Sequence, residues 1–257
     1  MDAASRTDEM IFAGMSRMVE HLPVGSLARF GGVSALITGV AHPSFNTTWS
    51  PSPQATPDDL SAAIDRLANG GYPYSAEVRA DTDDRFLEVL IAHGFAFIHT
   101  TPAMLTDRPS GLPWPDDLEL VTGPEAQADH EALLVSAFGL DPHLVTALVK
   151  PGLFTDPRVS VVVGRADGVP ATTALSVRVD DVVAVYNVAT DSAFRGRGFG
   201  AAATAAVIDP GFRDGATAAV LQSSEMGFRV YESLGFATVL THHRWGFADE
   251  YAALSPE

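Results

Sequence analysis

The stretch Arg195-Gly196-Arg197-Gly198-Phe199-Gly200 lies between an apolar run at residues 182–190 and a run of alanines, and it decides the fold. The apolar run is rich in β-branched residues, which predicts a buried strand. The alternating glycines let the backbone curl so that successive N–H groups point into one concavity. The alanines predict a helix that begins near Gly200 and leaves room for a large ligand. Together these features predict a cradle for a pyrophosphate, because helix N-termini bind anions.

The charged residues of this loop also favour phosphate binding, since Arg195 and Arg197 can add charge-assisted hydrogen bonds to phosphate oxygens. Neither of the two common nucleotide motifs is present. A P-loop needs Gly-Lys-Ser or Gly-Lys-Thr, and the only lysine of the chain is Lys150. The dinucleotide fingerprint needs a wider spacing than that between Gly198 and Gly200. The structural alternative is a tight strand-to-helix turn that binds nothing.

The sequence around the loop predicts a sheet with flanking helices. Extended stretches at residues 159–165, 171–179 and 182–190 are joined by the turn signals Asp167-Gly168 and Asp180-Asp181. Helices are predicted before them, and a strand, a helix and a last strand are predicted at residues 216–222, 226–234 and 236–247. Thr56 and Pro57 predict a helix start in the N-terminal half, as cap and first helical residue. This pattern predicts an α/β or α+β fold, with mixed sheets flanked by helices.

Two lobes are predicted from a segment rich in proline and glycine. The predicted parts are an N-terminal lobe at residues 1–106, a linker at 107–117 and a C-terminal domain at 118–257. Residues 85–95 align weakly with residues 226–236. Each segment reads as a helix ended by Gly-Phe, with the glycine in the left-handed conformation. Because a shared helix stop is common, the repeat needs support from elsewhere.

The composition excludes several classes of partner. A formal net charge of −16 argues against nucleic acid, because phosphate binding needs clustered Lys and Arg. The charge keeps the protein soluble, and it could also steer a cationic amine. No run of about eighteen apolar residues predicts a membrane span, and the first residues lack the pattern of a secretory signal. The chain has no cysteine, which excludes disulfides and a cysteine nucleophile and leads us to expect a cytoplasmic protein.

Three segments in order resemble the GCN5-related N-acetyltransferase (GNAT) family. They are Val188-Ala189-Thr190 with the glycine-arginine loop, then Leu221-Gln222-Ser223-Ser224-Glu225-Met226-Gly227, then Tyr231-Glu232-Ser233-Leu234-Gly235-Phe236. The resemblance implies a CoA site in the C-terminal domain. The strand at Val188, Ala189 and Thr190 would bind the pantetheine arm through its backbone. The amides of Arg195, Gly196, Arg197, Gly198, Phe199 and Gly200 would hold the pyrophosphate, with Ala201 beside it and Ser224 flanking the thioester.

The resemblance further implies that Tyr231 protonates the departing thiolate. A phenol, with a pKa of about 10, stays protonated at neutral pH and can donate to a thiolate whose pKa is about 8.5. The structural alternatives are a core aromatic for Tyr231 and a helix cap for Ser224. The general base is not resolved, and Glu225, His242 and His243 are weak candidates. No metal site is expected, since adjacent histidines on a strand face opposite ways.

The implied activity is transfer of an acetyl or other acyl group from acetyl-CoA to a primary amine, on a small molecule or a peptide N-terminus. The alternative is a non-catalytic acyl-CoA sensor or scaffold. The N-terminal lobe resembles a degenerate copy in a tandem GNAT protein. Residues 50–57 hold no glycine where a phosphate loop should stand, and Leu90 occupies the position that matches Tyr231. The acceptor and the oligomeric state are not predicted.

Overall fold

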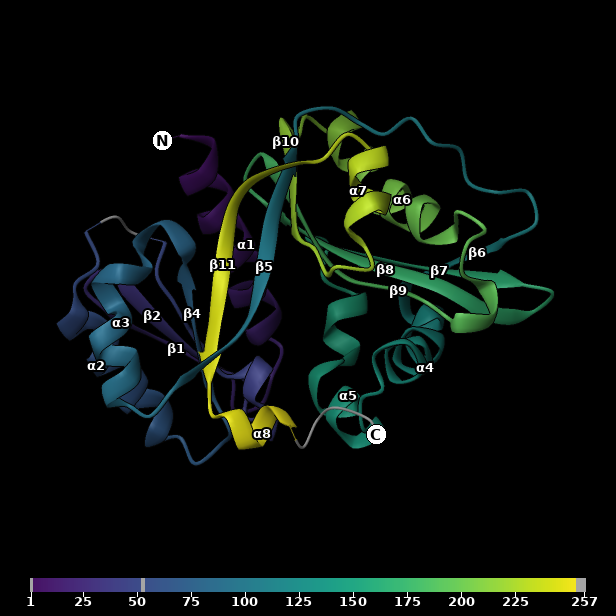
Figure 1. Ribbon diagram of the computed structural model, residues 1–257. Coiled ribbons are helices and arrows are strands. Elements are labelled where there is room, and N and C mark those ends of the chain that lie inside the picture. The colour runs from purple at the N-terminus through teal and green to yellow at the C-terminus, as the bar shows by residue number, and fades with distance from the viewer. Residues whose placement is uncertain (1, 52–53, 253–257) are drawn as a thin grey trace. The chain divides into compact units, whose positions relative to one another are not determined.

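The computed structural model describes residues 2–51 and 54–252, and the chain divides into two compact units (Figure 1). The first unit comprises Met1–Ala103 with Thr238–Glu257, and the second comprises Met104–Ala237. Ser52 and Pro53 of the predicted glycine-free loop, and the last five residues of the predicted C-terminal domain, lie outside the described residues. Within the described ranges, none of the helices is long and apolar enough to cross a bilayer.

The first unit is built on a mixed sheet whose neighbouring strands run in the order β1-β2-β3-β4-β11-β5. The strands β3 and β4 are parallel, whereas β4 pairs with β11 in antiparallel fashion. Its strands are β1 (Ser26–Phe30), β2 (Val33–Ile37), β3 (Thr47–Trp49), β4 (Ser75–Arg79), β5 (Ala96–Thr106, in this unit as far as Ala103) and β11 (Ala237–Gly246). Its helices are α1 (Ala3–Val19), α2 (Pro57–Ala68), α3 (Asp83–Ala92) and α8 (Ala248–Ala252), with 3-10 turns η1 (Pro43–Phe45) and η2 (Ala80–Thr82).

Local signals place the start of α2 and the end of α3 as predicted. Thr56 caps α2 by accepting the N–H of Asp59, whose side chain accepts the N–H of Thr56 in return, and Pro57 is the first helical residue. Gly94 ends α3 with a φ of +79°, and the Phe95 N–H bonds the Leu90 carbonyl at 3.0 Å. Because this stop needs the left-handed conformation, glycine stands there.

The two faces of the first sheet differ in chemistry. Helices α2 and α3 pack an apolar cluster that includes Leu60, Ile64 and Phe86. In a separate buried group, Asp8 of α1 accepts the Trp49 indole N–H at 2.7 Å and lies 2.9 Å from His242 Nε2. These hydrogen bonds offset the cost of burying the Asp8 carboxylate in the core.

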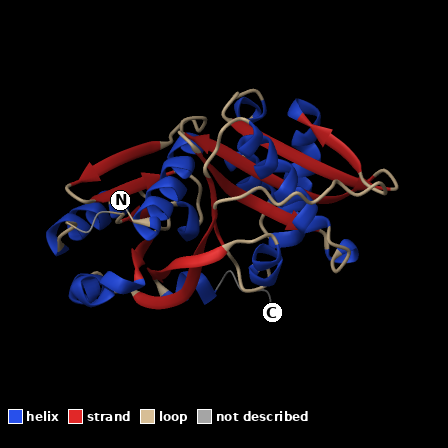
Figure 2. Cartoon of the chain, turned by 90° about the horizontal axis from the view of Figure 1, so that it is seen from above, coloured by secondary structure: helices blue, strands red, loops and turns tan. Residues whose placement is uncertain are grey.

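The strands of the second unit run in the order β10-β9-β8-β7-β6. In Figure 2 the strands of the chain are red and the helices beside them are blue. Only β9 and β10 are parallel, and the remaining pairs are antiparallel. Its strands are β6 (Glu119–Thr122), β7 (Val159–Ala166), β8 (Val169–Val179), β9 (Val182–Thr190) and β10 (Ala218–Gln222). Its helices are α4 (Gln127–Phe138), α5 (Pro142–Leu148), α6 (Phe199–Arg213) and α7 (Phe228–Ser233), with 3-10 turns η3 (Gly123–Ala126), η4 (Pro151–Phe154) and η5 (Ser192–Phe194). The expected mixed α/β fold is confirmed.

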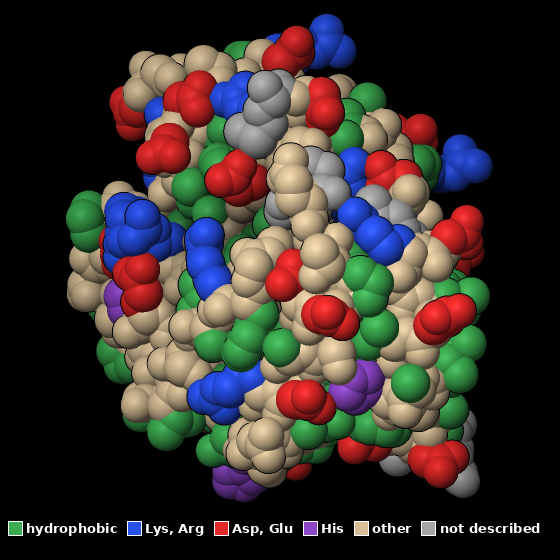
Figure 3. All heavy atoms as spheres, turned by 90° about the vertical axis from the view of Figure 1, so that its left-hand side faces the viewer, with side chains coloured by type: hydrophobic (Ala, Val, Ile, Leu, Met, Phe, Trp, Pro, Cys, Tyr) green, Lys and Arg blue, Asp and Glu red, His purple; other side chains and the backbone are tan. Residues whose placement is uncertain are grey.

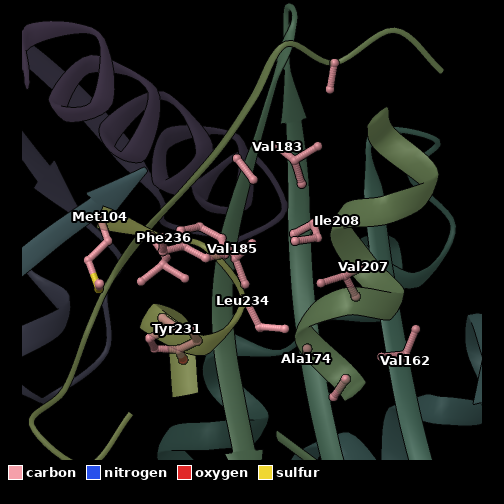
Figure 4. Close-up of a cluster of buried hydrophobic side chains, with 14 residues drawn as sticks. Met104, Val162, Ala174, Val183, Val185, Val207, Ile208, Tyr231, Leu234 and Phe236 are labelled. Carbon is pink, nitrogen blue, oxygen red and sulfur yellow. The ribbon is translucent and has the colours of Figure 1, made fainter. Parts of the chain in front are cut away.

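The core of the second unit joins α6 and α7 to the sheet (Figure 4). Val207 and Ile208 of α6 pack on Val183 and Val185 of β9. Each such side chain contributes about 1.5–3 kcal/mol when fully buried. Since α6 begins directly after the glycine loop, this packing fixes where its N-terminus stands.

Helix α7 repeats the end of α3. Gly235 has a φ of +90°, and the Phe236 N–H bonds the Tyr231 carbonyl at 3.0 Å. The same bond in the first unit joins Phe95 to Leu90. Tyr231 and Leu90 therefore occupy equivalent places in two structurally matching helix stops.

Candidate cofactor and active site

The strands β9 and β10 separate at the level of Val185. Their parallel pairing runs from Ala218 opposite Val182 to Leu221 opposite Val185. Beyond that point β9 continues to Thr190, whereas β10 ends at Gln222. Backbone polar groups on an unpaired strand edge need other hydrogen-bond partners. The segment from Val188 to Thr190 therefore offers a strand edge to which an extended ligand can bond.

A β-bulge bends β9 at this separation. Leu175 pairs with Tyr186 and Thr173 pairs with Ala189, so Ala174 faces two residues of β9. Asn187 takes a φ of +53°, a conformation that asparagine tolerates better than most residues. A bulge redirects the backbone groups next to it. Asn187 and Val188 thereby stand together opposite Ala174, next to the point where the pairing of β9 with β10 ends.

The glycine loop leads from β9 into α6. Asp191 accepts the Ala193 N–H at 3.0 Å and starts the 3-10 turn η5. Gly196 and Gly198 have φ values of +77° and +81°. A Cβ at either glycine would meet no atom within 4 Å. The backbone conformation, rather than a lack of space, therefore requires glycine, and this conformation aims the loop amides.

Helix α6 presents its first turn without a side-chain cap. Gly198 occupies the N-cap position and no side chain bonds the first amides. Those N–H groups have no partner within the helix, and the helix dipole adds positive potential beside them. The loop can therefore hold an anion such as a pyrophosphate.

Both loop arginines lie exposed and bond to neighbouring groups of the chain. Arg195 donates through Nε to the Thr190 carbonyl at 3.2 Å. Arg197 donates to Asp117 Oδ2 at 2.7 Å, and its guanidinium carbon lies 4.5 Å from the centre of the Phe199 ring. Each guanidinium has five N–H donors, so these bonds leave further donors beside the backbone amides of the loop.

The start of α6 and the end of β9 are in close contact. A Cβ on Gly200 would stand 3.1 Å from Thr190 Oγ1. Thr190 Oγ1 itself lies 3.0 Å from Thr172 Oγ1 of β8. Phe199 and Ala189 are buried, whereas Val188 and Ala201 are partly buried against the core. The predicted strand and loop residues are therefore brought together at the C-terminal end of β9.

Ser224 and Tyr231 both lie close to Gly227, in the turn and helix that follow β10. Ser224 Oγ accepts the Gly227 N–H at 3.1 Å, so it caps the turn before α7. A Cβ on Gly227 would stand 2.9 Å from the Tyr231 ring and 3.3 Å from Ser224 Oγ. This close approach explains glycine at position 227.

Tyr231 is largely buried in the core, with its ring in edge contact with Phe236. Burial raises the pKa of Tyr231 to about 12, since an apolar environment disfavours the phenolate. Tyr231 thus keeps its proton at neutral pH.

The three weak candidates for a general base have different surroundings. Glu225 is exposed at the end of β10. His242 is buried in the first unit beside Asp8, and the His243 ring is in edge contact with Phe97. Among the described residues, His, Asp and Glu side chains form no group of three that could hold a metal ion.

Sequence reasoning did not find the bulge or its supports. Asn187 interrupts the β-branched run, and that residue type in a strand was the available signal. Thr172 donates to the Ala189 carbonyl at 3.0 Å, and Thr173 Oγ1 lies 2.7 Å from His130 Nδ1. These contacts join residues far apart in the sequence, so no local pattern marks them.

Comparisons with known proteins give the same fold. Residues 128–236 match the model of the Acetyltransferase (GNAT) family. A GCN5-related N-acetyltransferase from Kribbella flavida is 23% identical, with a TM-score of 0.70 over 96% of each chain. One from Sphaerobacter thermophilus is 16% identical, with a TM-score of 0.60 over 83% of this chain and 76% of that chain. A tandem GNAT protein from the clavulanic acid biosynthesis pathway is 13% identical, with a TM-score of 0.60 over 90% of this chain and 86% of that chain. A search of the curated proteins gives no match.

Proposed function

We propose that the protein transfers an acyl group, most simply acetyl, from coenzyme A to a primary amine, since residues 128–236 match the model of the Acetyltransferase (GNAT) family. The observation that carries the proposal is the opening between β9 and β10, which leads directly to the glycine loop. An extended pantetheine arm needs a strand edge, and a pyrophosphate needs a helix N-terminus. Both stand in sequence along the same segment, from Val188 to Gly200.

The residues present fit acetyl-CoA as cofactor. The edge of β9 at Val188, Ala189 and Thr190 would bond the pantetheine arm. The amides from Arg195 to Ala201 would hold the pyrophosphate, with Gly196 and Gly198 supplying the left-handed backbone. When bound, acetyl-CoA supplies the acyl group as an activated thioester. Ser224, in the turn that follows β10, would flank that thioester.

The backbone amides of the bulge in β9 would polarise the thioester carbonyl. Asn187 and Val188 stand together opposite Ala174, next to the point where the pairing of β9 with β10 ends. Fixed N–H donors of this kind stabilise negative charge that develops on an acyl oxygen. The attacking group is the neutral amine, and the residue that takes its proton is not assigned.

Tyr231 is proposed as the general acid. Its hydroxyl holds a proton at neutral pH, because burial raises its pKa to about 12. Transfer to a thiolate of ordinary pKa, about 8.5, would be uphill. The same apolar surroundings raise the pKa of a thiol as well, so the pKa of the thiol and the pKa of Tyr231 become more similar. Tyr231 would therefore first donate a hydrogen bond to the developing thiolate and then its proton.

The acceptor is proposed to be a small-molecule amine or a peptide N-terminus. The net charge of −16 favours approach of a cation. On the face shown in Figure 3, acidic and basic side chains are interspersed rather than gathered by sign. The proposal includes an N-terminal lobe, residues 1–106, that is a degenerate GNAT copy with Leu90 in place of the tyrosine, a linker at 107–117, and a cytoplasmic location.

The test is release of free CoA from acetyl-CoA in the presence of a panel of amines, peptides with free N-termini included. Acceptor-dependent release, together with a mass increase of the acceptor by one acetyl group, is the expected result. Tight binding of CoA without turnover over the whole panel would contradict the enzyme proposal. That outcome would instead support the alternative of an acyl-CoA sensor or scaffold.

A further inference from the structure

His130 of α4 is a fully buried side chain with an unusual pattern of hydrogen bonds. Its Nδ1 lies 2.7 Å from Thr173 Oγ1, and Thr173 donates its hydroxyl hydrogen to the Val162 carbonyl at 2.7 Å. A hydroxyl has one hydrogen to give, so Thr173 must accept from the imidazole. His130 therefore carries its hydrogen on Nδ1.

The other ring nitrogen of His130 has nothing to bond. Nε2 is buried and lacks a hydrogen-bond partner among the described residues. With its hydrogen on Nδ1, this nitrogen presents an unused lone pair beside the edge-on ring of Phe154. Burial of an unpaired acceptor destabilises a fold. An apolar residue would avoid that cost, so the Nδ1–H bond to Thr173 is the feature that accounts for a histidine here.

Thr173 is the residue of β8 that adjoins the bulge. It pairs with Ala189, and the next pair along the ladder is Leu175 with Tyr186. The neighbouring Thr172 bonds the Ala189 carbonyl at 3.0 Å from the opposite face of β8. The two threonines thus hold β8 to β9 from one side and to α4 and β7 from the other. His130 is the only side chain that fixes the Thr173 hydroxyl from α4 among the described contacts.

We propose that His130 is a positioning residue for acyl transfer, which acts through Thr173 on the bulge at Asn187 and Val188. The inference rests on the proposed function, because it assigns the bulge amides to the thioester carbonyl. The His130 imidazole bonds the Thr173 hydroxyl, and Thr173 of β8 pairs with Ala189 of β9, which directly follows the two residues of the bulge. A displacement of about 1 Å at donors such as the bulge amides lowers a rate by about a hundredfold.

The test compares His130→Leu with His130→Asn and Thr173→Val in the full-length protein. Leucine removes the donor and the unpaired nitrogen together, whereas asparagine can place an amide N–H where Nδ1–H stands. In His130→Leu we expect kcat to fall by about ten- to a hundredfold, with a much smaller loss of affinity for CoA, because the glycine loop and α6 are not touched by the change. His130→Asn restores most of kcat, and His130→Leu combined with Thr173→Val is no worse than either alone.

A second readout does not depend on turnover. Amide hydrogen exchange at Asn187, Val188 and Ala189 should become faster in His130→Leu, while exchange at Val161 in β7 stays as in the wild type. Unchanged exchange at the bulge overturns the positioning role, even if the wild type transfers no acyl group to any amine. Equal losses of kcat, CoA affinity and thermal stability would also overturn it, since they would indicate a purely structural histidine. An inactive wild type with faster exchange at the bulge contradicts the proposed function alone.

Discussion

Arg197 of the glycine loop donates to Asp117 at 2.7 Å, across 80 residues of sequence. The pair is exposed, with about half of each side chain open to solvent (46% and 58%). Asp117 ends the segment between the two predicted lobes. The same segment bonds α6 a few residues earlier, where Ser110 and Gly111 donate their N–H groups to Asp209. A cation of the proposed phosphate site is thus held by a carboxylate from the linker.

Asp117→Asn should increase the affinity for CoA. The change removes a negative charge beside the loop and frees the Arg197 guanidinium for a phosphate oxygen. The expected gain is about two- to fivefold, the range of an exposed ion pair, measured as Kd by calorimetry. The gain should shrink in about 1 M salt, where screening is strong. Asp116→Asn serves as the control, because it removes one negative charge at the adjacent residue. A weaker affinity in Asp117→Asn would mean that Asp117 orients Arg197 for the cofactor.

Gly198→Ala should weaken CoA binding through backbone strain. A Cβ at position 198 meets no atom, but its φ of +81° costs a non-glycine residue about 1–2 kcal/mol. If the loop relaxes to relieve that strain, its amides move and affinity falls by about tenfold. Gly139→Ala is the control, because Gly139 ends α4 with a φ of +64° and equally open space. Both variants should lose similar free energy of unfolding, and only Gly198→Ala should lose affinity. Equal affinities for CoA in Gly198→Ala and Gly139→Ala would contradict the proposal that the glycine loop binds the cofactor.

Tyr231→Phe should lower kcat without changing CoA affinity. Loss of a general acid costs about a hundredfold or more, whereas the ring and its contact with Phe236 remain. The pKa of about 12 implies that Tyr231 does not ionise below about pH 11, so the alkaline limb of the kcat profile should persist in the variant. Steady-state rates from pH 6 to 10 would measure this. Tyr74→Phe, in the aromatic cluster of the first unit, controls for the loss of a hydroxyl. An unchanged kcat would exclude Tyr231 as the acid.

His130 should make the fold less stable in mild acid. Burial lowers the pKa of His130 from 6.5 to about 4, so between these values the unfolded chain binds a proton that the folded protein refuses. The neutral His130 therefore makes its full contribution to the free energy of unfolding above about pH 6.5. As the pH falls from 6.5 towards 4, the free energy of unfolding decreases by about 3 kcal/mol in total. Urea unfolding of wild type and His130→Leu from pH 4 to 7 would measure the difference. Parallel curves for the two proteins would contradict the assignment, since burial also lowers the pKa of His42 and His99 in both.

Features encoded within a few residues could be predicted from the sequence. The capped start of α2 at Thr56 and the glycine stops at Gly94 and Gly235 follow from local backbone preferences. The strand, glycine loop and helix from Val182 to Arg213 also follow from short-range patterns. Each depends on the conformations that a few neighbouring residues allow.

Features that depend on distant partners could not be predicted. Nothing near Asn187 indicates that Ala174 will face two residues, because a bulge is set by the register of two strands. The bond from His130 to Thr173 crosses 43 residues, and that from Asp117 to Arg197 crosses 80. The last strand was expected at residues 236–247, but its pairing with β4 has no signal of its own.

The pairing of β11 with β4 has a consequence for synthesis on the ribosome. All of the second unit, Met104–Ala237, emerges before Thr238 and the residues that follow it in β11. Until then β4 is paired with β3 on one side only, and Asp8 lacks His242, which follows it by 234 residues. Domains usually fold in the order of their translation. Here the first unit, which is translated first, should complete its fold last. The nascent chain therefore exposes an unpaired edge of β4, to which a chaperone or a second chain could bind.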